Sequence, residues 1–172
     1  MSTVTQKEFP APSALATPTT HSSEGAHRVT TALAQLTADA FALYIKTKNF
    51  HWHVSGPHFR DYHLMFDEQA DQVFDMIDAL AERARKVGGT TIRSVSHIAS
   101  LQRIKDDNDA FVDPQEMLKR LAADNLEYAR NLEEAHRVCG DAGDAATTSI
   151  LENYIDETER RVWFLSMAAE QN

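Results

Sequence analysis

Apolar residues recur every three or four positions along four long segments of the chain, which is the spacing of an amphipathic α-helix. The first segment is predicted from about residue 28 to residue 54, and its pattern ends at the helix-breaking triplet Ser55-Gly56-Pro57. The second is predicted from about residue 59 to residue 87 and ends at Gly88-Gly89. The apolar positions are Val29, Leu33, Leu36, Ala40 and Leu43 in the first segment and Phe59, Tyr62, Phe66, Val73, Ile77, Leu80 and Ala84 in the second.

Two further helices are predicted in the second half of the chain. One begins at Asp113-Pro114, which supplies an N-cap aspartate and a proline at the first helical position. The other begins near Asp144 and continues almost to the C-terminus. The connection over residues 90–112 is too long for a simple hairpin, and a short helix is predicted in it at about residues 95–101. We therefore predict an all-α fold, a four-helix bundle of ferritin-like topology with a long crossover between its second and third helices.

Length and composition fit one globular domain preceded by a tail. The chain has 172 residues, of which 42% are hydrophobic. Residues 1–27 are rich in Ser, Thr, Pro and Ala without an apolar period, so we predict a disordered tail there and a bundle domain over residues 28–172. No apolar run approaches the roughly 20 residues of a membrane span, and no signal peptide is recognisable. Because Cys139 is the single cysteine, no disulfide can form within the chain, and we expect a cytoplasmic protein.

Residue types that bind metals gather on the second predicted helix and just before it. The stretch from Asn49 to His63 contains four of the eight histidines. With His63 at 0° on a helical wheel, Asp67 lies at about 40°, Asp78 at about 60° and Glu82 at about 100°, whereas the apolar stripe is centred at about 290°. These side chains thus lie beside the core stripe, where a carboxylate is costly unless it is paired or binds a metal. Imidazole and carboxylate together favour iron, zinc or manganese.

One copy of this helix cannot bring the four residues together, because His63 and Asp78 would lie about 22 Å apart along it. The midpoint of positions 67 and 78 is 72.5, and the midpoint of positions 63 and 82 is the same. If two copies pack antiparallel across a two-fold axis, one register places Asp67 opposite the partner's Asp78 and His63 opposite the partner's Glu82. Such a symmetric interface would contain two equivalent sites.

Simpler explanations of the same residues remain open on the sequence alone. Acidic residues four positions apart on a helix are commonly solvated and need no metal. His51 is equally consistent with a core or capping histidine, whereas His53 and His58 are more typical of a surface or an interface. Trp52 is explained most simply by packing.

The residues around these positions resemble the Dps family, the mini-ferritins that protect DNA in starved cells. The pattern is H-W-x-V-x-G-P-x-F-x-x-x-H-x-x-x-[DE], followed by D-x-x-A-E-R and a glycine pair. In this chain it extends from His51 through His63 to Asp67, and then from Asp78 through Glu82 to Gly88-Gly89. The resemblance covers about residues 28–170.

The resemblance implies a hollow dodecamer built from two-fold dimers, which oxidises Fe(II) with hydrogen peroxide and stores the ferric mineral. It implies iron centres between subunits that can hold two irons. The implied ligands are His51, His63 and Asp67 from one chain and Asp78 and Glu82 from the other.

Further roles follow from the same resemblance. Asp141 and Asp144 flank the turn where the family has acidic three-fold pores, and Glu68 is a candidate for nucleating the mineral. The chain departs from the family in two respects. Leu64 stands where members often carry an acidic residue, and the lysine-rich tail of the DNA-binding members is missing.

Other functions fit the sequence less well. A DNA-compacting nucleoid protein with secondary iron activity needs a basic tail or face, but the net charge is −9 and Lys7 is the only Lys or Arg within residues 1–27. We therefore expect weak DNA binding or none, and no membrane partner. A ferritin with its di-iron site inside each bundle needs two Glu-x-x-His pairs, and only Glu133-x-x-His136 lies on a predicted core helix. A third alternative is a structural helical oligomer that binds no metal. In it, His63, Asp67, Asp78 and Glu82 would be ion-paired or solvated.

Overall fold

The computed structural model describes Phe9 and residues 11–169, and its regular structure there is helical. The elements are a 3₁₀ turn at Ser13–Leu15, α1 at Ser23–His53, α2 at Phe59–Lys86, α3 at Val95–Leu101, α4 at Pro114–Asp141 and α5 at Ala145–Ala169. This confirms the predicted all-α fold, including the short helix in the crossover. Within the described residues, no helix is both long and apolar enough to cross a membrane.

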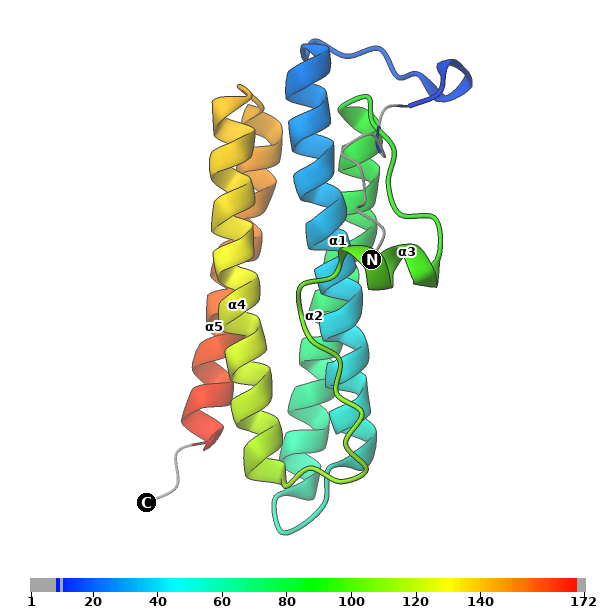
Figure 1. Ribbon diagram of the computed structural model, residues 1–172. Helices are drawn as coiled ribbons and strands as arrows, with labels where there is room; N and C mark the ends of the chain where they lie inside the picture. The colour runs from blue at the N-terminus through cyan, green and yellow to red at the C-terminus, as the bar shows by residue number, and fades with distance from the viewer. Residues whose placement is uncertain (1–8, 10, 170–172) are drawn as a thin grey trace.

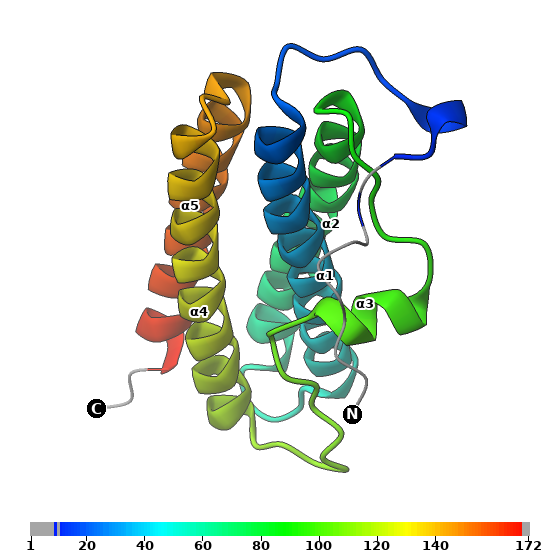
Figure 2. The ribbon, with the colours of Figure 1, turned by 45° about the horizontal axis from the view of Figure 1, so that its top comes forward.

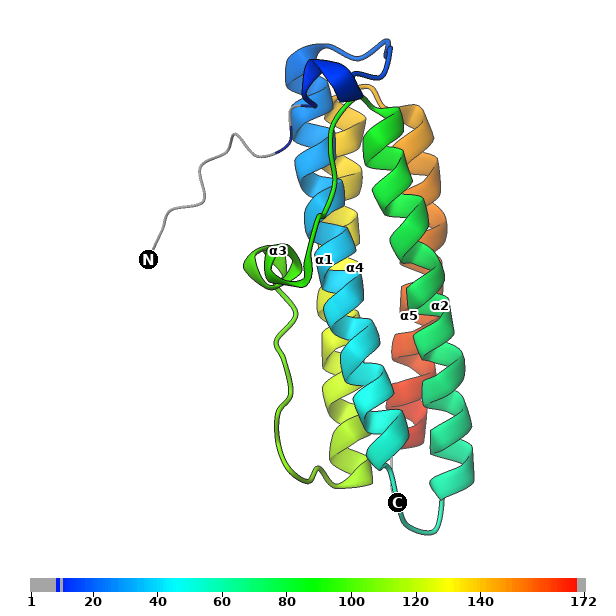
Figure 3. The same cartoon turned by 90° about the vertical axis from the view of Figure 1, so that its right-hand side faces the viewer.

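The four long helices form two antiparallel pairs, α1 with α2 and α4 with α5 (Figure 1). Viewed from nearer the helix ends, the two pairs lie against each other and close the bundle (Figure 2). Because α2 and α4 run in the same direction, the connection between them must travel the length of the bundle. It does so on the outside, where α3 lies against α1 (Figure 3).

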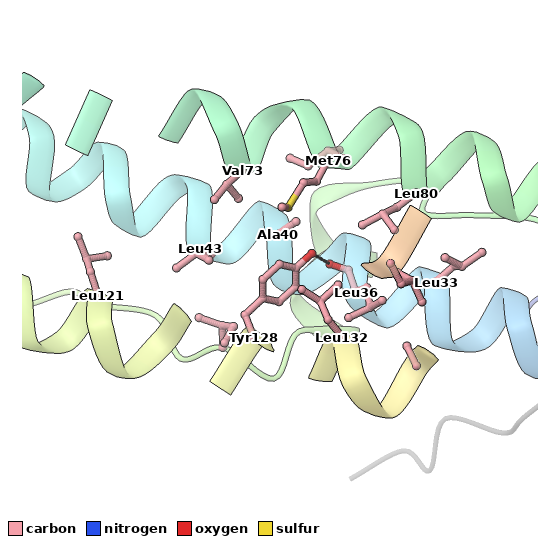
Figure 4. Packing of buried hydrophobic residues seen from close by; sticks show 14 of the residues in the cluster. Leu33, Leu36, Ala40, Leu43, Val73, Met76, Leu80, Leu121, Tyr128 and Leu132 are labelled. Carbon is pink, nitrogen blue, oxygen red and sulfur yellow. Dashed lines mark hydrogen bonds between the residues drawn. The ribbon is translucent and has the colours of Figure 1, made fainter. Parts of the chain in front are cut away.

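The core forms from the apolar stripes that the sequence predicts. All five predicted positions of α1 and five of the seven predicted positions of α2 are buried. From α4, Leu121, Tyr128 and Leu132 face these residues across the bundle (Figure 4). The exceptions lie in the first turn of α2, where Phe59 is 45% exposed and Tyr62 is partly buried. The end of α2 next to the α1–α2 turn is therefore less enclosed than its middle.

Helix α1 begins at Ser23, earlier than the start predicted near residue 28. The Ser22 side chain accepts a hydrogen bond from the Gly25 N–H, so this serine is the N-cap that the apolar period could not reveal. Ser23–His27 are thus helical, and the prediction of disorder is wrong for them. The rest of the predicted tail falls partly on residues 1–8 and 10, which lie outside the described residues.

The other helix ends follow the predicted signals. Asp113 caps α4 by accepting a hydrogen bond from the Gln115 N–H at 2.9 Å, with Pro114 at the first position. After α2, Gly88 adopts a positive φ of 106°. A side chain at Gly89 would collide with Thr30 of α1, so this glycine permits the close approach of the two helices.

Asp39 is the buried anchor of the crossover. Its carboxylate is fully buried in α1 and accepts hydrogen bonds from the Arg103 backbone N–H at 2.6 Å and from the Arg103 Nε at 2.9 Å and Nη2 at 2.7 Å. The Ile104 N–H and the Asn131 amide of α4 also donate to it, each at 3.3 Å. One carboxylate therefore ties the crossover to two helices of the bundle.

Asp39→Asn should lower the free energy of unfolding by about 2 kcal/mol or more, because charge-assisted hydrogen bonds to a buried acceptor are lost. Urea denaturation followed by circular dichroism measures the change. Asp156→Asn, an exposed position on α5, is the matched control and should change the midpoint little. Equal midpoints for the two variants would contradict the anchoring role of Asp39.

Candidate metal centre

His51 and His63 lock each other in place where α1 and α2 run side by side. The His51 Nδ1 lies 2.8 Å from the His63 carbonyl oxygen, and the His63 Nδ1 lies 2.9 Å from the His51 carbonyl oxygen. The two rings stack with centroids 3.8 Å apart and planes inclined by 23°. The contact is reciprocal, so each helix positions the imidazole of the other.

These hydrogen bonds fix which ring nitrogen can bind a metal. A carbonyl oxygen only accepts hydrogen bonds, so each Nδ1 must carry the proton. In the neutral imidazoles, the lone pair therefore resides on the Nε2 of His51 and of His63. Metal-ligating histidines commonly donate their other ring N–H to a backbone carbonyl in this way.

Asp67 lies near this histidine pair in the same chain. Its Oδ1 lies 3.6 Å from the His51 Nε2, too far for a hydrogen bond. It is close to the separation of about 3.4 Å between two ligands of a tetrahedral metal with bonds near 2.1 Å. The Lys48 Nζ also lies 2.5 Å from Asp67 Oδ1. This hydrogen bond lowers the pKa of Asp67 below its ordinary value, aided by the nearby histidines, and raises the pKa of Lys48.

The described residues of one chain do not form a complete metal site. Among Phe9 and residues 11–169, no three His, Cys, Asp or Glu side chains form a group that could hold a metal ion. The two imidazoles and one carboxylate are suitable donors for Fe(II), but an ammonium group already holds the carboxylate. A stable site therefore needs further carboxylates from elsewhere.

Asp78 and Glu82 lie farther along α2 and do not meet His51, His63 and Asp67 in the same chain. Because α2 is continuous over Phe59–Lys86, the helical rise keeps these groups about 20 Å apart. Both side chains are exposed, and the Glu82 carboxylate accepts a hydrogen bond from the Lys86 Nζ at 3.0 Å. The structure thus brings together three of the five predicted ligands and leaves the other two facing solvent.

Large apolar side chains are exposed on the same two helices. Ile45 and Trp52 are 56% and 61% exposed, and their spacing places them on the face of α1 that carries Lys48. Phe74 of α2 is 51% exposed, and its ring lies 5.1 Å from that of Tyr44. An exposed apolar surface around a polar constellation is typical of a protein–protein interface.

The remaining candidate residues lie apart from this group. Glu68 is exposed and accepts a hydrogen bond from the Gln72 amide at 3.3 Å. The Asp141 side chain is 73% exposed and lies 3.7 Å from the Arg28 guanidinium. Asp144 is only 1% exposed. Its Oδ1 accepts hydrogen bonds from the Arg83 guanidinium and from the Thr147 backbone N–H in the first turn of α5. Burial is the largest single influence on Asp144 and opposes its ionisation, but the hydrogen bonds from Thr147 and Arg83 together outweigh it, so the pKa of Asp144 is lowered.

Comparison with known proteins identifies the family. The ferritin-like domain family matches residues 30–171. A DNA protection during starvation protein of Brevibacillus brevis is 32% identical over 133 residues, which are 77% of this chain and 89% of that protein. The chain belongs to the Dps family of ferritin-like proteins. A low temperature-induced protein of Nostoc, itself uncharacterised, is 34% identical over 134 residues, which are 77% of this chain and 75% of the relative.

Solved Dps structures have the same architecture. The Dps protein from Bacillus brevis superposes with a TM-score of 0.83 at 30% identity, over 87% of this chain and 99% of that chain. Dps from Thermosynechococcus elongatus gives a TM-score of 0.83 at 26% identity, over 87% of this chain and 94% of the other. Both confirm the ferritin-like bundle with its short helix in the crossover.

Lys48 is the residue that the sequence analysis missed. It precedes His51 by three positions on α1, so the two side chains lie on one face of the helix. That spacing was available in the sequence, but lysine is not a usual ligand. In the structure its ammonium group is hydrogen-bonded to the carboxylate of Asp67, a predicted ligand.

Lys48→Met should strengthen the binding of a divalent metal by about two- to five-fold, which is the range of a partly exposed ion pair. The raised pKa of Lys48 keeps the ammonium charged across the neutral range, so the competition it exerts should not vary there. Calorimetric titration with Co(II) at fixed ionic strength measures the affinity. Lys119→Met, an exposed lysine on α4, controls for the lost charge. Weaker binding in Lys48→Met would show that Lys48 supports the metal rather than competing with it.

Proposed function

We propose that this member of the Dps family oxidises Fe(II) with hydrogen peroxide at centres shared by two subunits, and stores the ferric product inside a hollow cage. The observation that carries the proposal is the reciprocal pair of His51 and His63. The His51 Nε2 of this pair lies 3.6 Å from the Asp67 Oδ1, and these three side chains are one chain's share of the proposed site.

A second subunit would supply the other half. In the antiparallel register centred at position 72.5 of α2, His63 and Asp67 of one chain lie near the partner's Glu82 and Asp78. Ile45, Trp52 and Phe74 support the same arrangement, because a two-fold partner would cover their exposed surfaces. The ligand set in this proposal is His51, His63 and Asp67 with the partner's Asp78 and Glu82.

The chemistry follows from these donors. Three carboxylates and two imidazoles bind Fe(II) without fully enclosing it, and carboxylates favour Fe(III) once it forms. Each Fe(II) gives up one electron, whereas hydrogen peroxide takes two electrons and two protons to form two molecules of water. A centre that oxidises two Fe(II) ions per peroxide therefore avoids the one-electron reduction that releases hydroxyl radical.

The proposed assembly is a dodecamer built from two-fold dimers, as the family resemblance implies. Exposed carboxylates suit the roles proposed for Glu68 in nucleation and for Asp141 at an entry pore. The proposed pore role of Asp144 stays a prediction, and its buried, hydrogen-bonded carboxylate favours the capping role instead.

DNA is protected in this proposal by the removal of Fe(II) and peroxide rather than by binding of the duplex. The net charge is −9, and residues 11–22 contain no lysine or arginine. Few counterions would therefore be released from DNA, so the electrostatic contribution to binding is small.

Anaerobic protein loaded with Fe(II) and titrated with hydrogen peroxide should consume about one peroxide for every two irons, with little radical captured by a spin trap. The particle mass, measured on the same sample, should correspond to the proposed cage. His63→Ala is the control and should oxidise iron slowly. A ratio near one iron per peroxide with abundant trapped radical would refute the proposed reaction.

Segregated substitutions test the sharing of the centre between subunits. His63→Ala and Glu82→Ala should each inactivate a homodimer, because each leaves a damaged ligand in both sites. In a mixed dimer, one site inherits both lesions and the other inherits neither. Activity should therefore return to about half of the native sites in a pure heterodimer, and to about a quarter after random pairing.

The control for this experiment is a chain carrying both substitutions, mixed with the native chain. Its heterodimers contain one lesion in each site, so they should have no intact site. Particle mass verifies that mixing has occurred. If the segregated pair shows no rescue in properly mixed particles, the centre is not shared, and His63 and Glu82 have separate functions.

A further inference from the structure

Phe59, the first residue of α2, is an aromatic residue that lies largely outside the core. The apolar pattern of α2 predicts a core position for it, yet it is 45% exposed. Its ring packs instead against the imidazole of His63, one turn farther along the helix, with centroids 5.1 Å apart and planes inclined by 33°. This separation lies within the range of favourable aromatic pairs, roughly 4.5–7 Å. The exposed ring therefore contacts one of the predicted metal ligands.

The His63 imidazole contacts two rings, which come from different helices. His51 of α1 stacks on it with centroids 3.8 Å apart and planes inclined by 23°, and Phe59 of α2 makes the second contact. Within the described part of the chain, Phe59 and His51 form no ring contact with each other. The two rings thus approach His63 from different directions, and together they limit the orientations that its imidazole can adopt.

His63 depends on this restriction more than His51 does. His51 is 8% exposed, whereas His63 is only partly buried. Rotation of a histidine ring about the Cβ–Cγ bond has two broad minima, and a half-turn exchanges each ring nitrogen with a carbon. Such a half-turn of His63 would break the contact of 2.9 Å between its Nδ1 and the His51 carbonyl oxygen, and would move Nε2. During the rotation the imidazole must stand edge-on to its neighbours, which the flanking rings obstruct.

The turn between α1 and α2 sets the position of the Phe59 ring. Gly56 adopts a positive φ of 94°, and its carbonyl oxygen accepts a hydrogen bond from the Phe59 N–H at 3.0 Å. In the first turn of α2, the Tyr62 hydroxyl accepts a hydrogen bond from the Gln115 amide of α4 at 3.0 Å. The backbone that carries the Phe59 ring is therefore held both by the turn and by a second helix pair.

We propose that Phe59 is a positioning residue of the metal centre, whose ring holds the His63 imidazole in the one orientation that presents Nε2 to a metal. This inference rests on the proposed function, in which His63 is a ligand. It accounts for an exposed aromatic ring at the start of a helix. A ligand that is fixed beforehand loses less freedom when the metal binds, so the contact strengthens metal binding.

Solid-state NMR of the sedimented, metal-free protein tests the positioning directly. With 13C-labelled histidine, the order parameter of the His63 Cε1–H bond reports the motion of this ring, and its signal is identified by its loss in His63→Gln. In Phe59→Leu, which keeps an apolar side chain but removes the flat ring, the order parameter should fall from about 0.85 to about 0.6, the values of rigid and mobile groups. Phe59→Tyr keeps the ring and should retain the native value.

The affinity for Co(II), measured by calorimetric titration, tests the consequence for metal binding. Phe59→Leu should bind Co(II) about two- to ten-fold more weakly, which is the contribution of one aromatic contact, and Phe59→Tyr should bind it as the native protein does. The matched control is Phe164→Leu. Phe164 of α5 is 43% exposed, and its ring lies 5.1 Å from that of Trp163. Its loss should change neither the motion of His63 nor the affinity for Co(II).

A role of Phe59 in subunit contact alone gives a different result. The particle mass of Phe59→Leu would then change while the His63 ring stayed fixed, and this outcome would overturn the proposal. An order parameter equal to that of the native protein, or an equal affinity for Co(II), would overturn it as well. A native protein that bound no Co(II) would refute the proposed metal centre instead, and the metal-free NMR measurement would still decide whether Phe59 holds His63.

Discussion

The fixed rise of an α-helix is the constraint on which the proposed centre depends. A residue of α2 cannot approach another that lies fifteen positions along the same uninterrupted helix. His63 and Asp67 are therefore separated from Asp78 and Glu82 in every single copy of the chain, whatever the side chains do. Such a constellation can serve one metal only if the protein associates with itself. Oligomerisation is then a condition of the proposed chemistry rather than an addition to it.

The second requirement of the proposed centre is that its ligands are rigid before a metal binds. His51 and His63 meet it through mutual hydrogen bonds to each other's backbone, which fix both the tautomer and the ring orientation. The buried stripes of α1 and α2 hold the two backbones at the necessary distance, and Gly89 allows their close approach at the far end. The packing of the bundle and the position of the imidazole nitrogens are therefore parts of one arrangement.

Much of this arrangement could be predicted from the sequence, because periodicity and end signals are local. The helices, the short helix in the crossover and the core positions followed from them. The start of α1 was missed because Ser22 acts through a single hydrogen bond outside the apolar pattern. The ion pair of Lys48 with Asp67 joins α1 to α2, and the hydrogen bond from the buried Arg161 to Asn125 joins α5 to α4. Only the folded chain shows these contacts. Coincident midpoints on α2 predicted a shared site, and the i,i+4 spacing of Glu82 and Lys86 indicates their ion pair. No pattern in the sequence could predict that Lys48 of α1 contacts Asp67 of α2.

The ion pairs of Lys48 with Asp67 and of Lys86 with Glu82 affect the order of subunit association and iron binding in the proposed protein. In the proposed two-fold interface, carboxylates from both subunits converge, and their mutual repulsion would oppose association in the absence of metal. Lys48 and Lys86 hold two of these groups within single chains. Under the proposed function, newly made subunits can therefore associate before iron binds. In this proposal, assembly of the particle is uncoupled from the supply of iron.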